Sequence, residues 1–256
     1  MMTALVDADS LLYRVLCPLE EKVVWNEQEV EAFGEEPEVV YFIDISQAYK
    51  TFDQMIENIL FATGCDGVVL VFTSSGNFRD DLPIAYKANR KELRKPTGFK
   101  ELLDYAYSNY NTKDHPKLEA DDIVVYLKTK YPDKYVLCAI DKDVVNQTVG
   151  THYNYNTDEE TEVTQEEATY FAYYQTLTGD VTDGYKGCPG IGPVKAKKIL
   201  ADCKNEVEMW EAVVTTYESK KLTERDAILT MNLANMHQFD GKNVKLWKPP
   251  VMGDVS

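Results

Sequence analysis

Histidine, cysteine and basic residues are scarce in this chain of 256 residues. It contains three histidines and five cysteines, and its 27 lysines and arginines face 43 aspartates and glutamates, giving a formal net charge of −16. The histidines show no metal-ligand spacing, and an odd number of cysteines without such spacing indicates reduced thiols, as in a cytoplasm. No long apolar segment or basic leader is visible, so we expect no membrane span and no signal peptide. With 44% hydrophobic residues, the chain has room for one large domain and an appendage.

Eight of the acids fall into four short clusters spread over most of the chain. They are Asp7 in LVDAD, Glu119, Asp121 and Asp122 in LEADD, Asp141 and Asp143 in AIDKD, and Asp180 and Asp183 in GDVTD. Carboxylates packed together raise one another's pKa values, so a shared site implies bound divalent cations. Hard oxygen ligands favour Mg²⁺ or Mn²⁺, and two such ions are a common means of in-line phosphodiester cleavage. The clusters therefore indicate a two-metal nuclease.

The apolar pattern predicts that these clusters converge. Short β-rich runs, typical of strands buried on both faces, occur at 4–6, 68–72 and 135–140. Helical patterns lie between them, so the chain is expected to form an α/β fold with a mostly parallel central sheet flanked by helices. Ligand sites of such sheets lie beyond the carboxyl ends of the strands, where Asp7 and Asp141 fall. Glu119 and Asp122, three apart at a helix start, share a face.

The negative net charge alone would argue against binding to nucleic acid, but the basic residues gather in two stretches that could contact phosphates. Residues 79–100 hold seven basic and three acidic residues, and 184–200 hold four lysines and no acid. The second stretch contains the turn GCPGIG, which resembles the hairpin of a helix-hairpin-helix element. Gly190 and Gly192 would let the backbone approach a phosphate, and Lys195 and Lys197 follow on the next helix. We expect this element to bind duplex DNA, with an ordinary tight turn as the alternative.

Six sequence blocks together carry a family resemblance. They are, in order, VDADSLLYR, VFTSSGNFR, AYKANR, LEADD, AIDKD and GDVTDGYKGCPGIG. This set resembles the flap endonuclease, or 5′-nuclease, superfamily, and within it the 5′→3′ exonucleases of short-tailed bacteriophages, from about Ala4 to Pro249. The resemblance implies a metal-dependent 5′→3′ exonuclease that acts on double-stranded DNA with a free or flapped 5′ end, or on RNA/DNA hybrids, and releases 5′-phosphate products. It also implies a monomer, located in the host cytoplasm if a phage encodes it.

The resemblance also assigns residues and cofactors. All eight clustered acids match metal ligands of the family, and two Mg²⁺ (or Mn²⁺) ions are implied, with K⁺ as a further cation at the hairpin 187–192. Lys87 and Arg79 are placed as catalytic cations near the scissile phosphate. Tyr86, Arg90 and Lys91 are placed along the DNA, although Tyr86 is equally well interpreted as a core residue.

We expect two ligand groups around the ions. One group is Asp7, Glu119 and Asp121, the other is Asp141, Asp143 and Asp183, and Asp122 and Asp180 bridge through water. The implied organisation is a nuclease core at 1–178, with a short open arch near 86–118 that contains one helix near 99–110, followed by a helix-hairpin-helix DNA-binding subdomain with C-terminal helices at 179–256. An acidic hairpin is expected within 20–42.

The chain departs from the family pattern after the strand at 68–72. Many relatives carry an aspartate there, whereas this chain reads Thr73-Ser74-Ser75. Water in place of the ligand, a ligand from elsewhere such as Asp9, or a substitution made to block turnover are the possible explanations. Strand alternation favours Asp9 pointing away from Asp7. Two other functions stay open. One is a PIN-like ribonuclease, which shares the fold and the acids but ordinarily lacks the hairpin and its lysines. The other, suggested by Thr73-Ser74-Ser75, is a non-catalytic DNA-end-binding protein with a degraded metal site.

Overall fold

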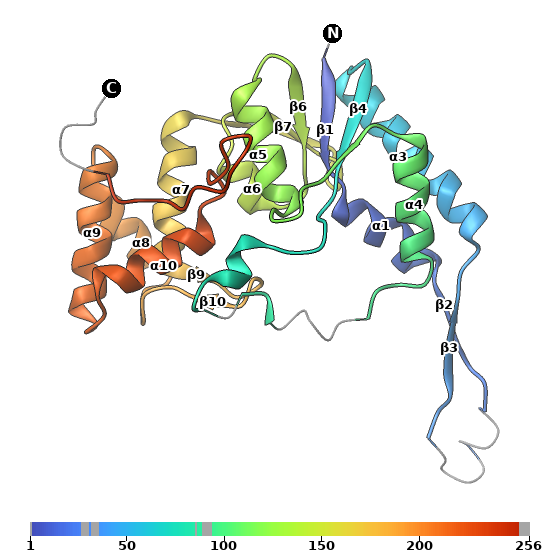
Figure 1. The fold of residues 1–256 in the computed structure, drawn as a ribbon, viewed down its shortest axis with the longest axis horizontal. Helices are drawn as coiled ribbons and strands as arrows, with labels where there is room; N and C mark the ends of the chain where they lie inside the picture. Colours follow the sequence, from blue (N-terminus) through green and yellow to red (C-terminus); the bar gives the residue numbers. More distant parts are fainter. Residues whose placement is uncertain (1, 27–30, 32–35, 85, 89–93, 251–256) are drawn as a thin grey trace.

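A six-stranded sheet forms the centre of the protein (Figure 1). The computed structural model describes residues 2–26, 31, 36–84, 86–88 and 94–250. The strands are, in order across the sheet, β5 (Thr112–Lys113), β4 (Gly67–Val71), β1 (Thr3–Asp7), β6 (Tyr135–Cys138), β7 (Gly150–Asn154) and β8 (Glu159–Val163). All neighbours pair in parallel except β7 and β8, which are antiparallel. This confirms the predicted mostly parallel sheet.

Helices cover both faces of the sheet, as the alternation of strands and helices predicts. One face packs against α1 (Asp9–Leu19), α3 (Ile45–Thr63) and α4 (Phe99–Asn109), and the other against α5 (Ala120–Lys130) and α6 (Lys142–Asn146). Along β1, Ala4 and Val6 belong to the first core and Leu5 to the second. A strand buried on both faces needs such a continuous apolar run, and it leaves Asp7 at the edge where the run ends.

Side-chain caps fix where two helices begin. Asp44 starts α3, because its carboxylate accepts hydrogen bonds from the backbone N–H groups of Ser46 and Gln47. Glu119 starts α5 in a capping box with Asp122, in which each carboxylate accepts a backbone N–H at the other residue. The second cap bears on function, because it places two of the clustered acids in the first turn of α5.

Four helices form a smaller unit with its own core. They are α7 (Gln165–Thr178), α8 (Pro193–Leu200), α9 (Glu206–Ser219) and α10 (Glu224–Ala234), and they pack around Trp210, Val213, Tyr217 and Met231. The short strands β9 (Gly179–Asp180) and β10 (Tyr185–Lys186) connect α7 to the turn before α8. α7 precedes the predicted division at 178, yet it packs with the helices that follow it. No described helix has the length and apolar character needed to cross a membrane.

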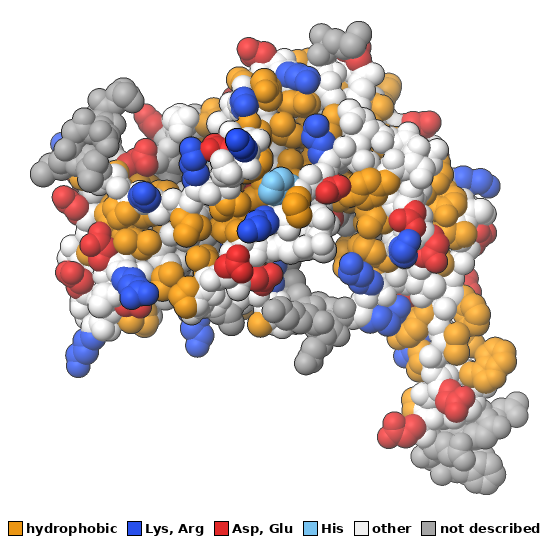
Figure 2. Space-filling model, viewed as in Figure 1, with side chains coloured by type: hydrophobic (Ala, Val, Ile, Leu, Met, Phe, Trp, Pro, Cys, Tyr) orange, Lys and Arg blue, Asp and Glu red, His pale blue; other side chains and the backbone are white. Residues whose placement is uncertain are grey.

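A two-stranded antiparallel ribbon extends away from the body, made of β2 (Glu21–Val24) and β3 (Val39–Phe42) (Figure 1). This confirms the hairpin predicted within 20–42. The pairing of Val23 with Val40 puts both on the face that also carries Phe42. These side chains are 37%, 39% and 48% exposed, and Trp25 beyond the strand is 71% exposed. Figure 2 shows hydrophobic side chains gathered along this ribbon.

Candidate active site

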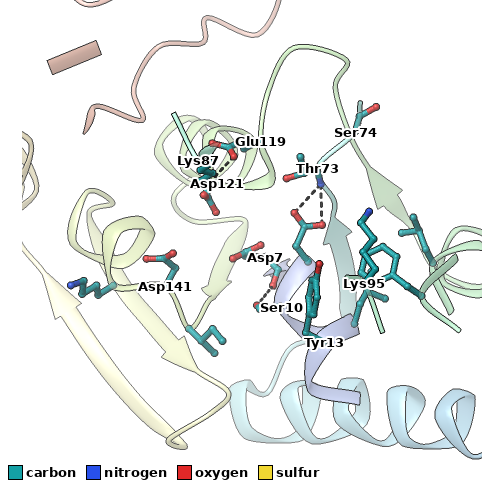
Figure 3. Close-up of a pocket in the computed structure, with 16 residues that line it drawn as sticks. Asp7, Ser10, Tyr13, Thr73, Ser74, Lys87, Lys95, Glu119, Asp121 and Asp141 are labelled. Atoms are coloured by element: carbon teal, nitrogen blue, oxygen red, sulfur yellow. Dashed lines mark hydrogen bonds and ion pairs between the residues drawn. The ribbon is translucent and has the colours of Figure 1, made fainter. Parts of the chain in front are cut away.

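Five carboxylates line a pocket of about 700 Å³ at the carboxyl ends of the central strands. Asp7 ends β1, Asp9 begins α1, Glu119 and Asp121 lie at the start of α5, and Asp141 follows β6. Figure 3 shows Asp7, Glu119, Asp121 and Asp141 around a common space. The structure therefore brings four of the eight predicted ligands together, from segments that are far apart in the sequence.

Burial and mutual repulsion disfavour the charged forms of these acids. Burial, followed by the charges of Asp9 and Asp141, raises the pKa of Asp7 to about 8. Burial and then Asp7 raise the pKa of Asp121 well above its ordinary value. Glu119 differs, because the nearby cations Lys87 and Arg79 outweigh its burial and lower its pKa. Without a bound cation, the pocket therefore holds more carboxyl protons near neutral pH than free carboxyl groups would.

Lys87 lies at the pocket and connects two acid clusters. Its Nζ is 2.6 Å from Oε1 of Glu119 and 3.7 Å from Oδ1 of Asp183. Burial opposes the charge of Lys87, but Glu119 and Asp121 outweigh it and raise its pKa, so it is an ammonium group at neutral pH. The hydroxyl of Tyr86 lies 2.8 Å from Glu119 and 3.0 Å from Asp183 and donates its proton to one of them. Tyr86 is only 6% exposed, which favours the core interpretation of this residue.

Arg79 and Asp122 form a buried pair away from the pocket. Arg79 donates from both terminal nitrogens to the two carboxylate oxygens of Asp122, and each residue is 1% exposed. Neither residue lines the pocket. The sequence predicts a cation near the scissile phosphate and a water-mediated metal ligand at these positions. In the structure the two residues pair with each other beside Glu119, whose Oε2 is 3.6 Å from Arg79.

Asp143 and Asp180 form a second acidic group between α6 and β9. Gln175 donates to Asp143 at 2.6 Å and to Asp180 at 3.4 Å. Burial, then Asp141, raises the pKa of Asp143 to about 7, and its Oδ1 is buried without a hydrogen-bond partner. Oδ1 of Asp180 accepts the backbone N–H groups of Thr182 and Asp183. An ionised carboxylate oxygen buried without a donor is costly, and either a proton shared with Asp180 or a bound cation would offset that cost.

The donor chemistry of these groups suits a hard divalent cation such as Mg²⁺ or Mn²⁺. Such a cation would satisfy Oδ1 of Asp143 and offset the repulsion around Asp7. In the described part of the chain, however, no three Asp, Glu, His or Cys side chains are arranged to hold one ion as they stand. Side chains would therefore have to rotate for three carboxylates to bind the same ion.

The prediction that Asp9 points away from Asp7 is wrong, because both line the same pocket. Strand alternation does not extend to Asp9, since β1 ends at Asp7 and Asp9 already belongs to α1. Sequence reasoning also missed Thr73, whose backbone N–H donates to Asp9 and whose hydroxyl accepts from the N–H of Ala120. It missed Tyr155 as well, whose hydroxyl donates to the carbonyl of Asp7 at 2.8 Å. Only the Asp-x-Asp spacing at 7 and 9 offered a signal.

The predicted DNA-binding turn lies in the helical unit. Gly190 has a φ of 75°, in the left-handed region that favours glycine, and Gly192 caps α8, where Pro193 is the first residue. Lys195 donates from Nζ to the carbonyl of Gly190 at 2.9 Å, and Lys195 and Lys197 are both exposed.

The backbones of Gly179 and Gly187 approach so closely that a Cβ on either would overlap the other, which joins this turn to Asp180. Arg90 and Lys91 lie outside the described residues. The helix predicted near 99–110 is confirmed as α4, which packs on α1 and α3.

No family model matches the chain, but individual proteins do. It is 27% identical over 221 residues to the exonuclease of Escherichia phage T7, in a match that covers 71% of this chain and 74% of that protein. It is 26% identical over 221 residues to the exodeoxyribonuclease of Enterobacteria phage T3, covering 71% and 73%. Its fold is similar to that of the bacteriophage T5 flap endonuclease, solved as a pseudo-enzyme-product complex with DNA and metal ions. That match has a TM-score of 0.68 at 14% identity and covers 93% of this chain and 90% of that one.

Proposed function

Since the chain is a member of the flap endonuclease, or 5′-nuclease, superfamily and is similar to phage exonucleases, we propose that it is a divalent-metal-dependent 5′→3′ exonuclease that acts on DNA. The observation that carries this proposal is the convergence of Asp7, Glu119, Asp121 and Asp141 with Lys87 in one pocket. Carboxylates that can hold divalent cations beside a cationic side chain suit a reaction in which negative charge grows on a phosphate.

We assign the metal ligands as two groups. Asp7, Glu119 and Asp121 would hold one ion, and Asp141, Asp143 and Asp183 would hold the other, with Asp180 beside Asp143. Two ions held by these residues would supply Lewis-acid activation of a water molecule and stabilisation of the leaving oxygen. Asp122 would position the start of α5 rather than bind an ion, because both of its oxygens accept hydrogen bonds from Arg79.

Lys87 has the role of orienting Glu119 and contacting the scissile phosphate. Its ammonium group lies at the pocket and is charged at neutral pH, so it can offset charge that develops during cleavage. Tyr86 helps to hold Glu119 and Asp183 in place, because its hydroxyl lies within hydrogen-bond distance of both carboxylates.

The turn at 187–192 and the exposed Lys195 and Lys197 would bind the phosphates of duplex DNA. A free or flapped 5′ end, an RNA/DNA hybrid as a further substrate, K⁺ at the turn, a monomeric state and the host cytoplasm as the location all belong to this proposal. The turn and its lysines favour DNA cleavage over a PIN-like ribonuclease. The acids retained in the pocket favour catalysis over a DNA-end-binding protein, because an abandoned site would gain stability by losing them.

The test uses Asp121→Asn and Asp141→Asn with 5′-labelled duplex, flap and RNA/DNA substrates in Mg²⁺ and Mn²⁺. The wild type should cleave a DNA substrate, and each variant should cleave at least about 10²-fold more slowly, while DNA binding in Ca²⁺ persists. Asp104→Asn, which changes an exposed acid of α4, is the matched control and should cleave like the wild type. Wild-type rates in Asp121→Asn and Asp141→Asn would refute the site, and absence of product from the wild type would refute the activity.

A further inference from the structure

Asp9 is a carboxylate of the pocket to which the proposed function gives no task. It begins α1 immediately beyond β1 and lines the same pocket as Asp7, Glu119, Asp121 and Asp141. The backbone N–H of Thr73 donates to both of its oxygens, at 3.1 Å and 3.2 Å. In the part of the chain that the structure describes, no ion pair includes Asp9.

Thr73 connects Asp9 to the helix that carries two of the proposed ligands. The hydroxyl of Thr73 accepts the backbone N–H of Ala120 at 2.9 Å, in the first residue of α5. Asp9, Thr73 and Ala120 thus form a chain of hydrogen bonds from α1, across the segment after β4, to the helix next to Glu119 and Asp121. The position of Asp9 relative to those acids is therefore fixed by hydrogen bonds through Thr73.

The carboxylate of Asp9 has unused capacity to bind a cation. Two carboxylate oxygens offer about four acceptor positions, and the backbone N–H and the side chain of Thr73 use only part of these. Ser74, the next residue along the chain, also lines the pocket but brings no carboxylate. Asp9 is thus the acid that enters the pocket beside the segment where Thr73-Ser74-Ser75 offers none.

We propose that Asp9 is an additional metal ligand, held in place by Thr73, and that it supplies the carboxylate that the segment 73–75 lacks. This inference rests on the proposed function. A role confined to holding Thr73 and the start of α5 is the competing interpretation, and substitutions that separate charge from hydrogen bonding distinguish the two.

Asp9→Asn keeps an oxygen that can accept the Thr73 N–H and removes the charge, whereas Asp9→Ala removes both. Binding of Mn²⁺ would be measured by titration calorimetry and by electron paramagnetic resonance, with the melting temperature as a measure of folding. If Asp9 is a ligand, both variants should bind Mn²⁺ at least about 10-fold more weakly at one site, the scale of losing a group that tunes a metal site. Asp9→Ser, which keeps a small acceptor without charge, replaces Asp9→Asn if that variant does not fold.

A second experiment moves the carboxylate from position 9 to the segment 73–75. Ser74→Asp combined with Asp9→Asn should restore Mn²⁺ affinity, because Ser74 lines the same pocket. Ser75→Asp combined with Asp9→Asn is the matched control and should not, since Ser75 does not line the pocket. Wild-type Mn²⁺ affinity in Asp9→Asn, with loss only in Asp9→Ala, would overturn the ligand assignment in favour of positioning. Failure of Ser74→Asp to restore affinity would also overturn it. A wild-type chain that binds no Mn²⁺ would instead overturn the proposed function itself.

Discussion

Arg79 donates two hydrogen bonds of 2.8 Å to the carboxylate of Asp122, and both residues are buried. The other bonds of Arg79 reach the carbonyl of Leu233, at 3.1 Å, and the carbonyl of Asn235, at 3.2 Å, at the end of α10. One guanidinium thus joins the 3₁₀ turn Phe78–Asp81, the start of α5 and the helical unit. This pair fixes the acids of α5 relative to the part of the chain proposed to hold DNA.

Arg79→Ala should strongly destabilise the protein, because it leaves Asp122 buried without its partner. The expected loss in the free energy of unfolding is about 3–5 kcal/mol, measured by urea denaturation. Arg79→Met combined with Asp122→Leu should lose less, since no uncompensated charge stays buried. Lys100→Ala is the control, because its ion pair with Asp104 is exposed and should contribute little. A mild effect of Arg79→Ala would contradict the inferred role of the pair.

Lys87→Ala should slow chemistry more than it weakens DNA binding. Its Nζ contacts Glu119 in the pocket, where charge would develop on the phosphate. Single-turnover cleavage at saturating DNA should fall by about 10²-fold. Affinity measured in Ca²⁺ should change little by comparison. A variant that regains the full rate when the DNA concentration is raised would show that Lys87 acts in binding alone.

The metal-free protein should lose stability as the pH rises from about 4 to about 8. A carboxyl group whose pKa is higher in the folded than in the unfolded chain favours unfolding at any pH above its unfolded pKa, and this destabilisation grows until the pH passes its folded pKa. Burial, with neighbouring acids, raises the pKa of Asp7 from 3.8 to about 8 and that of Asp143 from 3.8 to about 7. The destabilisation should therefore grow through this window and level off above it, as measured by urea denaturation in EDTA.

Two additions test the origin of that pH dependence. Asp7→Asn should flatten the profile and raise the metal-free melting temperature at pH 8. Saturating Mg²⁺ should raise the melting temperature of the wild type at pH 8, because the ion binds the native state. Stability that increases with pH in EDTA would argue against a shared carboxylate site. Equal melting temperatures with and without Mg²⁺ would do the same.

Lys195→Ala combined with Lys197→Ala should weaken duplex binding without lowering the saturated cleavage rate. Both lysines are exposed on the helix that follows the 187–192 turn. Each lost phosphate contact should reduce the slope of log affinity against log salt by roughly one unit. Lys242→Ala combined with Lys248→Ala removes the same charge from exposed positions elsewhere and serves as the control. If the control double variant loses as much affinity and slope, the turn has no special role.

The sequence predicts the sheet and the central part of the pocket well, because both follow from local patterns. Apolar runs that end in aspartate place Asp7 and Asp141 at the carboxyl edge of a parallel sheet whichever helices cover it. The partner of Asp122 cannot be predicted from such local patterns. Its spacing from Glu119 suggests a shared face, but which cation binds it depends on packing with Arg79, a residue distant in sequence. Asp9 was misassigned for a local reason, since strand alternation stops at the junction with α1.

β1 contributes Asp7 from the middle of the sheet, and this position has a consequence for the nascent chain. Thr3 pairs with Gly67 on one side and with Tyr135 on the other, so both neighbours of β1 are made long after it. Such long-range pairing is expected to fold slowly. A chain still on the ribosome cannot assemble the pocket until β6 and Asp141 have emerged, and the acid set stays incomplete until Asp180 and Asp183 follow. If the proposed site is correct, a fragment that stops short of these residues should neither cleave DNA nor gain stability from Mg²⁺.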